Sequence, residues 1–174
     1  MNYAVIILCD TLNGVGFRTS LFVSGCGKNP KCKYCQNKEA WDFNYGNKFT
    51  EKEKNMIFKE QEKPWMKGIS LLGGEVTDNL DDGVLLDFLK EYKEKFPTKD
   101  IWCWTGYKLE DLTSDNHKKL LSYVDVLIDG EYDYTKKNLN RAWANSENQR
   151  IFRKNERGEF YECKEEWLNY RRRN

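Results

Sequence analysis

Three cysteines in one short segment are the residues of this chain best suited to chemistry. Cys26, Cys32 and Cys35 lie in the sequence S-G-C-G-K-N-P-K-C-K-Y-C, a C-x5-C-x2-C arrangement. Three thiolates on one loop can hold a 4Fe-4S cluster by three of its corners, which leaves the fourth iron open to a ligand that is not protein. Because an open iron can bind and activate a molecule, the spacing indicates a catalytic cluster rather than one that only carries electrons.

Zinc is the alternative that these cysteines leave open. Structural zinc sites have four protein ligands, and they often combine a C-x2-C pair with a second such pair or with two histidines. The chain contains a single C-x2-C pair, so a fourth ligand would come from an isolated residue of another segment. The residues that could supply it are Cys9, Cys103, Cys163 and His117. A zinc-stabilised binding module without catalysis is therefore a second hypothesis.

Length, charge and hydropathy limit the classes of protein to which this chain can belong. A chain of 174 residues is expected to form one domain, residues 1–174, that can bury a real core. Its 29 basic and 28 acidic side chains nearly cancel, so we expect no direct binding of nucleic acid. The chain has neither a long apolar run nor a signal-like start, which favours a cytoplasmic protein without a membrane segment. The basic run Arg171, Arg172 and Arg173 is interpreted as a solvated tail.

Short apolar runs alternate with amphipathic stretches, and this alternation predicts an α/β fold. Strands are expected at 4–8, 20–23, 68–72, 101–104 and 124–128, and helices at about 50–63, 82–96 and 115–123. The capping-box spacing of Thr50 and Glu53 marks the start of the first helix. The turn N-E-R-G predicts a hairpin between 150–153 and 159–163. The order of strands and helices argues for a largely parallel sheet.

Glycines mark the ends of three successive predicted strands. They are Gly73 and Gly74, Gly106 after Thr105, and Gly130 after Asp129. In parallel sheets, ligands bind at the carboxyl ends of the strands. Because the cysteine loop also follows a predicted strand, these positions together predict a small-molecule site at one rim of the sheet.

The cysteine loop, followed by Gly73-Gly74-Glu75, resembles the radical S-adenosylmethionine superfamily. The segments N-G-V-G-F-R at 13–18 and W-T-G-Y at 104–107 narrow this resemblance to the activating component of the anaerobic (class III) ribonucleotide reductase. The resemblance extends to about Phe152, so residues 153–174 are expected to be an unmatched C-terminal extension.

The chain departs from that family in its cysteine spacing. The family usually has three residues between the first two cysteines, whereas this chain has five. We expect the two extra residues to bulge outward at Asn29-Pro30, a pair that favours turns.

The resemblance implies a fold, a mechanism and a partner. The fold would be a compact partial (β/α) barrel of the radical S-adenosylmethionine type. A low-potential donor such as flavodoxin would reduce the cluster, which would cleave S-adenosylmethionine to methionine and a 5′-deoxyadenosyl radical. That radical would take a hydrogen atom from a glycine of the reductase's catalytic subunit. Another small radical enzyme acting on a small molecule, such as a deazapurine-forming synthase, is the close alternative.

The resemblance also implies roles for particular residues. Cys26, Cys32 and Cys35 would be the iron ligands. Glycines without a Cβ would let the backbone approach S-adenosylmethionine closely. The residues expected to contact this cofactor are Tyr34 (against the adenine), Cys35, Gln36, Gly73, Gly74, Glu75, Thr105 and Asp129. Arg18, on a loop near the expected cluster, would contact either the partner or solvent.

Overall fold

An eight-stranded sheet organises the chain in the computed structural model, which describes residues 1–163. The strands are β1 (Asn2–Asp10), β2 (Phe17–Val23), β3 (Asn47–Lys48), β4 (Met66–Gly73), β5 (Asp100–Trp104), β6 (Val126–Asp129), β7 (Arg150–Lys154) and β8 (Phe160–Glu162). The helices are α1 (Glu51–Gln61), α2 (Val84–Lys95) and α3 (Asp115–Tyr123), with short 3-10 turns η1 (Lys38–Trp41), η2 (Val76–Asp78), η3 (Leu109–Asp111) and η4 (Tyr134–Lys136). The predicted α/β class is confirmed.

The centre of the sheet is parallel and its edges are antiparallel. The strand order is β3-β1-β2-β4-β5-β6-β7-β8, and the pairs β2–β4, β4–β5 and β5–β6 are parallel. β1 runs antiparallel to β2 and β3, and β7 runs antiparallel to β6 and β8. The antiparallel pair of β7 and β8 is the predicted hairpin. The four parallel strands therefore end at one rim of the sheet.

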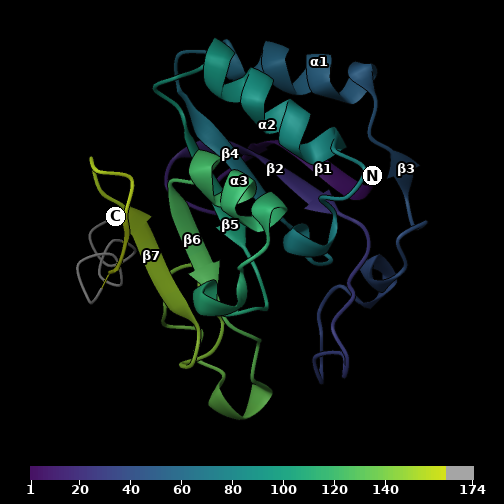
Figure 1. Cartoon of the computed structure of the whole chain (residues 1–174), viewed down its shortest axis with the longest axis vertical. Helices are drawn as coiled ribbons and strands as arrows, with labels where there is room; N and C mark the ends of the chain where they lie inside the picture. The colour runs from purple at the N-terminus through teal and green to yellow at the C-terminus, as the bar shows by residue number, and fades with distance from the viewer. Residues whose placement is uncertain (164–174) are drawn as a thin grey trace.

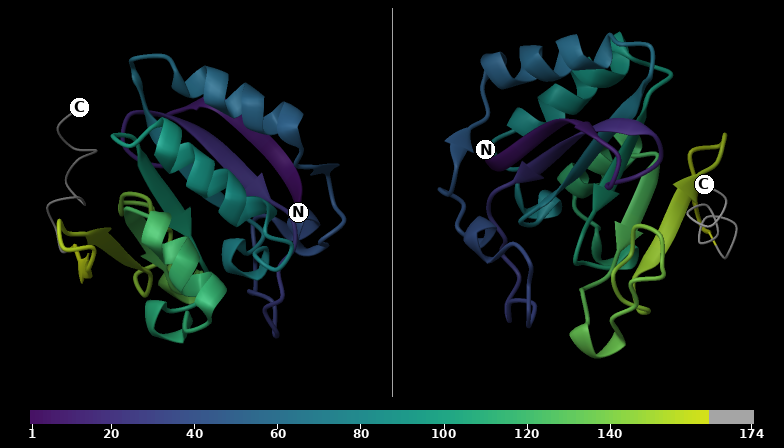
Figure 2. Two further views of the ribbon diagram at one scale, coloured as in Figure 1. Left: turned by 45° about the horizontal axis from the view of Figure 1, so that its top comes forward. Right: turned by 180° about the vertical axis from the view of Figure 1, so that it is seen from behind.

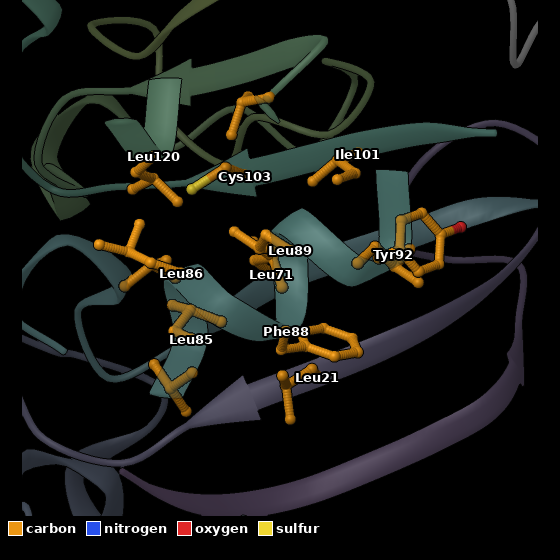
Figure 3. Packing of buried hydrophobic residues seen from close by; sticks show 14 of the residues in the cluster. Leu21, Leu71, Leu85, Leu86, Phe88, Leu89, Tyr92, Ile101, Cys103 and Leu120 are labelled. Atoms are coloured by element: carbon orange, nitrogen blue, oxygen red, sulfur yellow. The ribbon is translucent and has the colours of Figure 1, made fainter. Parts of the chain in front are cut away.

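The three helices cover one face of the sheet, as Figures 1 and 2 show. α2 directs its apolar side chains at the strands, and Figure 3 shows Leu85, Phe88 and Leu89 packed near Leu21 of β2 and Leu71 of β4. All five of these side chains are buried. For the three on α2, this confirms the apolar face that their spacing along the helix predicts. Burial of each such side chain contributes about 1.5–3 kcal/mol, so this face holds the main core.

A capping box marks the start of α1. The Thr50 side chain accepts a hydrogen bond from the backbone of the first turn, while the Glu53 side chain accepts one from the Thr50 backbone N–H. This reciprocal bonding satisfies backbone donors that the start of a helix leaves unpaired. The predicted helix start is thereby confirmed.

The opposite face of the sheet carries a second apolar cluster, in which Trp102, Ile128 and Trp143 are buried. Arg18 lies beside this cluster and is fully buried, contrary to the expected contact with a partner or solvent. Its guanidinium donates to the Ser70 hydroxyl at 2.7 Å and to the Asp100 carboxylate at 2.6 Å. Arg18 therefore joins β2, β4 and β5.

No helix in residues 1–163 is long and apolar enough to cross a membrane. The basic run Arg171, Arg172 and Arg173 lies outside the described residues.

Candidate cofactor site

A cavity of about 570 Å³ lies at the carboxyl ends of the parallel strands. The long loops that follow β2 and β6 extend from this end of the sheet, at the bottom of Figure 1. The cavity is within the size range of small-molecule sites. Most of the predicted site residues line it: Cys26, Cys32, Cys35, Gln36, Gly73, Gly74, Glu75 and Thr105.

Hydrogen bonds from its backbone N–H groups hold the start of the cysteine loop in place. Gly25 N–H donates to the Ala40 carbonyl at 2.8 Å, and Cys26 N–H donates to the Trp41 carbonyl at 3.2 Å. Gly27 N–H donates to the carboxylate of Asp78, which lies in η2, at 2.6 Å. These bonds fix the first cysteine between two short 3-10 turns.

The rest of the loop turns outward before it returns to the cavity. Asn29 and Pro30 are exposed, at the place where the two extra residues were expected to bulge. Cys35 N–H then donates to the Cys32 carbonyl at 3.2 Å, so the second and third cysteines lie on one tight turn. The longer spacing thus still brings three thiols to the same cavity.

Burial raises the pKa of the Cys26 thiol and raises that of Cys32 to about 12. Near Cys32, the Glu131 carboxylate adds to this effect because it disfavours a second negative charge. Metal binding needs the thiolate, so loading a metal group onto these cysteines must release protons.

The geometry favours a cluster over a closed zinc site. A closed zinc site needs four protein ligands, whereas a 4Fe-4S cluster can be held by three thiolates. The residues that could complete a zinc site, which are Cys9, Cys103, Cys163 and His117, do not line the cavity. Three thiols around one cavity therefore fit an iron–sulfur cluster.

The two glycines at the end of β4 allow the strand end to pack against the cysteine loop. Gly74 N–H donates to the Val23 carbonyl at 2.8 Å, and Glu75 N–H donates to the Gly25 carbonyl at 2.7 Å. Gly73 has a φ of +119°, and a Cβ on Gly74 would lie 2.3 Å from the Gly25 oxygen. The glycines are thus required by close approach to protein backbone, in addition to any ligand.

Glu75 joins two strand ends within the cavity wall. It is buried, and its carboxylate accepts hydrogen bonds from the Thr105 hydroxyl at 2.7 Å, from Gly106 N–H at 2.7 Å and from the Thr77 hydroxyl at 2.8 Å. Burial raises the pKa of this carboxyl, while the donated hydrogen bonds act in the opposite direction. Glu75 and Thr105 are therefore one unit of the site.

Two predicted residues lie elsewhere: within the described chain, neither Tyr34 nor Asp129 lines this cavity. Tyr34 is 53% exposed, and its ring centroid lies 4.6 Å from that of Tyr134. The Asp129 carboxylate accepts from Arg150 Nε at 2.9 Å and from Leu109 N–H at 2.7 Å. Asp129 therefore fixes the end of β6 and, unlike Glu75, does not line the cavity.

Sequence reasoning missed a whole wall of the cavity. This wall, residues 137–149, contributes Leu139, Arg141, Trp143, Asn145 and Gln149. It has no helical or strand periodicity, and only the segment S-E-N-Q-R at 146–150, which overlaps its end, carried any family signal. Such irregular loops give no pattern from which burial can be read.

Comparison with known proteins identifies the family to which the chain belongs. Residues 12–152 match the family model described as a 4Fe-4S single cluster domain, which defines the class of protein. A relative from Pasteurella multocida (strain Pm70) is 40% identical over 88% of this chain and 98% of its own length. A relative from Enterobacteria phage T4 is 38% identical over 87% and 94%, and one from Escherichia coli (strain K12) is 35% identical over 86% and 96%. Each of the three is named anaerobic ribonucleoside-triphosphate reductase-activating protein. The chain belongs to this family of activating proteins.

Proposed function

We propose that this chain is a radical S-adenosylmethionine enzyme that generates a glycyl radical on the catalytic subunit of an anaerobic ribonucleotide reductase. The observation that carries the proposal is the meeting of Cys26, Cys32 and Cys35 with the Gly73-Gly74-Glu75 segment around one cavity of a family member. The electron donor would be a low-potential protein such as flavodoxin, and the reaction would take place in the cytoplasm.

The three cysteines would hold a 4Fe-4S cluster, and the remaining iron would be open toward the cavity. Gln36, Gly73, Gly74, Glu75 and Thr105 would hold S-adenosylmethionine beside it. When bound, the cluster and S-adenosylmethionine together supply the one-electron chemistry that removes a hydrogen atom from a glycine. In this proposal the sheet, with its helices on one face, would be the partial (β/α) barrel that the family resemblance implies.

The chain's own residues would prepare the site for that chemistry. Glu75 places a carboxylate at the ends of β4 and β5, where its hydrogen bonds to Thr105 and Gly106 hold it in one orientation. The apolar walls formed by Phe22, Leu72 and Trp104 would displace water from the bound cofactor. Excluding water protects a reactive species from side reactions.

The test is anaerobic reconstitution followed by electron paramagnetic resonance. Protein loaded with iron and sulfide is mixed with a reductant, S-adenosylmethionine and the reductase subunit, and methionine release is measured in parallel. We expect a glycyl radical signal only when the reductase subunit is present. Methionine release without a glycyl signal would favour the small-molecule alternative, and a colourless protein that retains zinc would favour the binding module.

A further inference from the structure

The cavity wall at residues 137–149 contains a guanidinium group that is anchored but carries an uncompensated charge. Arg141 donates from Nη1 to the backbone carbonyls of Ser146 at 2.6 Å and Gln149 at 2.7 Å. Among residues 1–163 no carboxylate lies within ion-pair distance of it. Arg18 and Arg150, by contrast, are each paired with an aspartate, at 2.6 and 2.5 Å.

The anchoring leaves part of the guanidinium available. Arginine has five N–H donors in a fixed planar fork, and the two backbone carbonyls occupy Nη1 alone. Within the described chain, Nε and Nη2 make no hydrogen bond. Because Arg141 also lines the cavity, these remaining donors can serve a ligand there.

The wall itself is fixed to the sheet, so the position of Arg141 is set before any ligand binds. Trp104 Nε1 donates to the Trp143 carbonyl at 2.8 Å, and the Trp143 ring lies edge-on to Trp102 at 5.0 Å. Asn138 N–H donates to the Asn145 carbonyl at 3.0 Å, which closes the loop on both sides of Arg141. A group held in this way loses little freedom on binding.

The other cation of the cavity wall is already compensated. Lys28 Nζ donates to the Gly106 carbonyl at 2.9 Å, lies 4.4 Å from the centre of the Tyr107 ring, and lies 3.8 Å from the Glu131 carboxylate. Within residues 1–163, the cavity thus presents one buried acid, Glu75, and one cation without an ion-pair partner, Arg141. This pair of charges complements a zwitterion that carries both an ammonium and a carboxylate.

We infer that Arg141 binds the carboxylate of the amino-acid moiety of S-adenosylmethionine. The inference rests on the proposed function, because it takes S-adenosylmethionine as the ligand of the cavity. Arg141 is then a binding residue of the site that neither the cysteine motif nor the Gly-Gly-Glu segment reveals.

The test compares two ligands and two substitutions by equilibrium dialysis of anaerobic, cluster-loaded protein. The ligands are S-adenosylmethionine and its decarboxylated analogue, which lacks the carboxylate. The substitutions are Arg141→Gln and, as a matched control, Arg157→Gln, at an exposed arginine in the turn between β7 and β8. Arg141→Lys, which keeps the charge, serves as a second variant, and iron content and melting temperature report whether each protein folds.

Arg141→Gln should weaken binding of S-adenosylmethionine by roughly 10- to 100-fold, the worth of a hydrogen bond to a charged group, and should leave binding of the decarboxylated analogue unchanged. Arg141→Lys should weaken it less, and Arg157→Gln should have no effect. Equal loss for both ligands, or no loss for either, would overturn the inference alone. Failure of the unsubstituted protein to bind S-adenosylmethionine would overturn the proposed function and this inference together.

Discussion

Substitution of Gly74 by alanine should disrupt the contact between the end of β4 and the cysteine loop. The added Cβ would lie 2.3 Å from the Gly25 oxygen and 2.7 Å from the Ala40 oxygen, so one backbone segment must move by roughly 1 Å. Such a movement breaks the hydrogen bonds from Glu75 N–H to Gly25 and from Gly25 N–H to Ala40, at 2.7 and 2.8 Å. At about 1 kcal/mol for each bond, together with about 1–3 kcal/mol of overpacking, the expected loss is about 3–5 kcal/mol.

The assay measures melting temperature by circular dichroism and iron content after anaerobic reconstitution. A chain of this size loses about 2–4 °C per kcal/mol, so Gly74→Ala should melt roughly 6–20 °C lower. It should also hold less iron, because Cys26 directly follows Gly25. The matched control is Gly158→Ala, at a φ of +82° with no atom within 4 Å of the added Cβ. This control should lose only about 1–2 kcal/mol through its backbone conformation and should keep its iron. A Gly74→Ala protein with unchanged melting and full iron content would refute the reasoning.

Three further perturbations test other contacts of the fold and site. Glu75→Gln should destabilise the fold by about 2–4 kcal/mol, since one carboxylate oxygen faces Thr77 N–H and the other faces Gly106 N–H, so the new amide N–H₂ must face one of these two donors; unchanged thermal melting would contradict this. Arg18→Met should cost about 2–4 kcal/mol in urea unfolding, because it leaves the buried Ser70 hydroxyl and Ile69 carbonyl without the hydrogen bonds that the guanidinium donates; a loss below about 1 kcal/mol would argue against the observed contacts. Arg150 lowers the pKa of Glu110 from 4.5 to about 2, so the stabilisation from this pair is complete above pH 4.5 and is lost as the pH falls toward 2. The melting temperature should therefore fall more between these pH values in the unsubstituted protein than in Glu110→Gln, and parallel curves would count against the pair.

The features that the sequence predicted correctly depend on local signals. The capping box of Thr50 and Glu53 lies within one helical turn, and the structure confirms the helix start there. Glycines after consecutive strands predicted a shared rim because strand order and direction follow from the alternation of elements. Gly73, Gly74 and Gly106 indeed line one cavity.

The features that the sequence did not predict depend on partners far along the chain. The burial of Arg18 requires Asp100, which lies 82 residues later, and no local pattern predicts this pairing. In the same way, Asp129 is occupied by Arg150 from the next strand, so its position at a strand end did not make it a cavity residue. Arg141 lies in an irregular loop whose path is set by contacts of Trp143 with distant strands.

The proposed cluster site is tested most directly by the iron content of single cysteine variants after anaerobic reconstitution. The unsubstituted protein and Cys9→Ala, at an exposed cysteine of β1, should each hold about four irons per chain, the content of one 4Fe-4S cluster. Cys26→Ala, Cys32→Ala and Cys35→Ala should each fail to retain it. A full complement of iron in any of these three variants would contradict ligation by the loop cysteines.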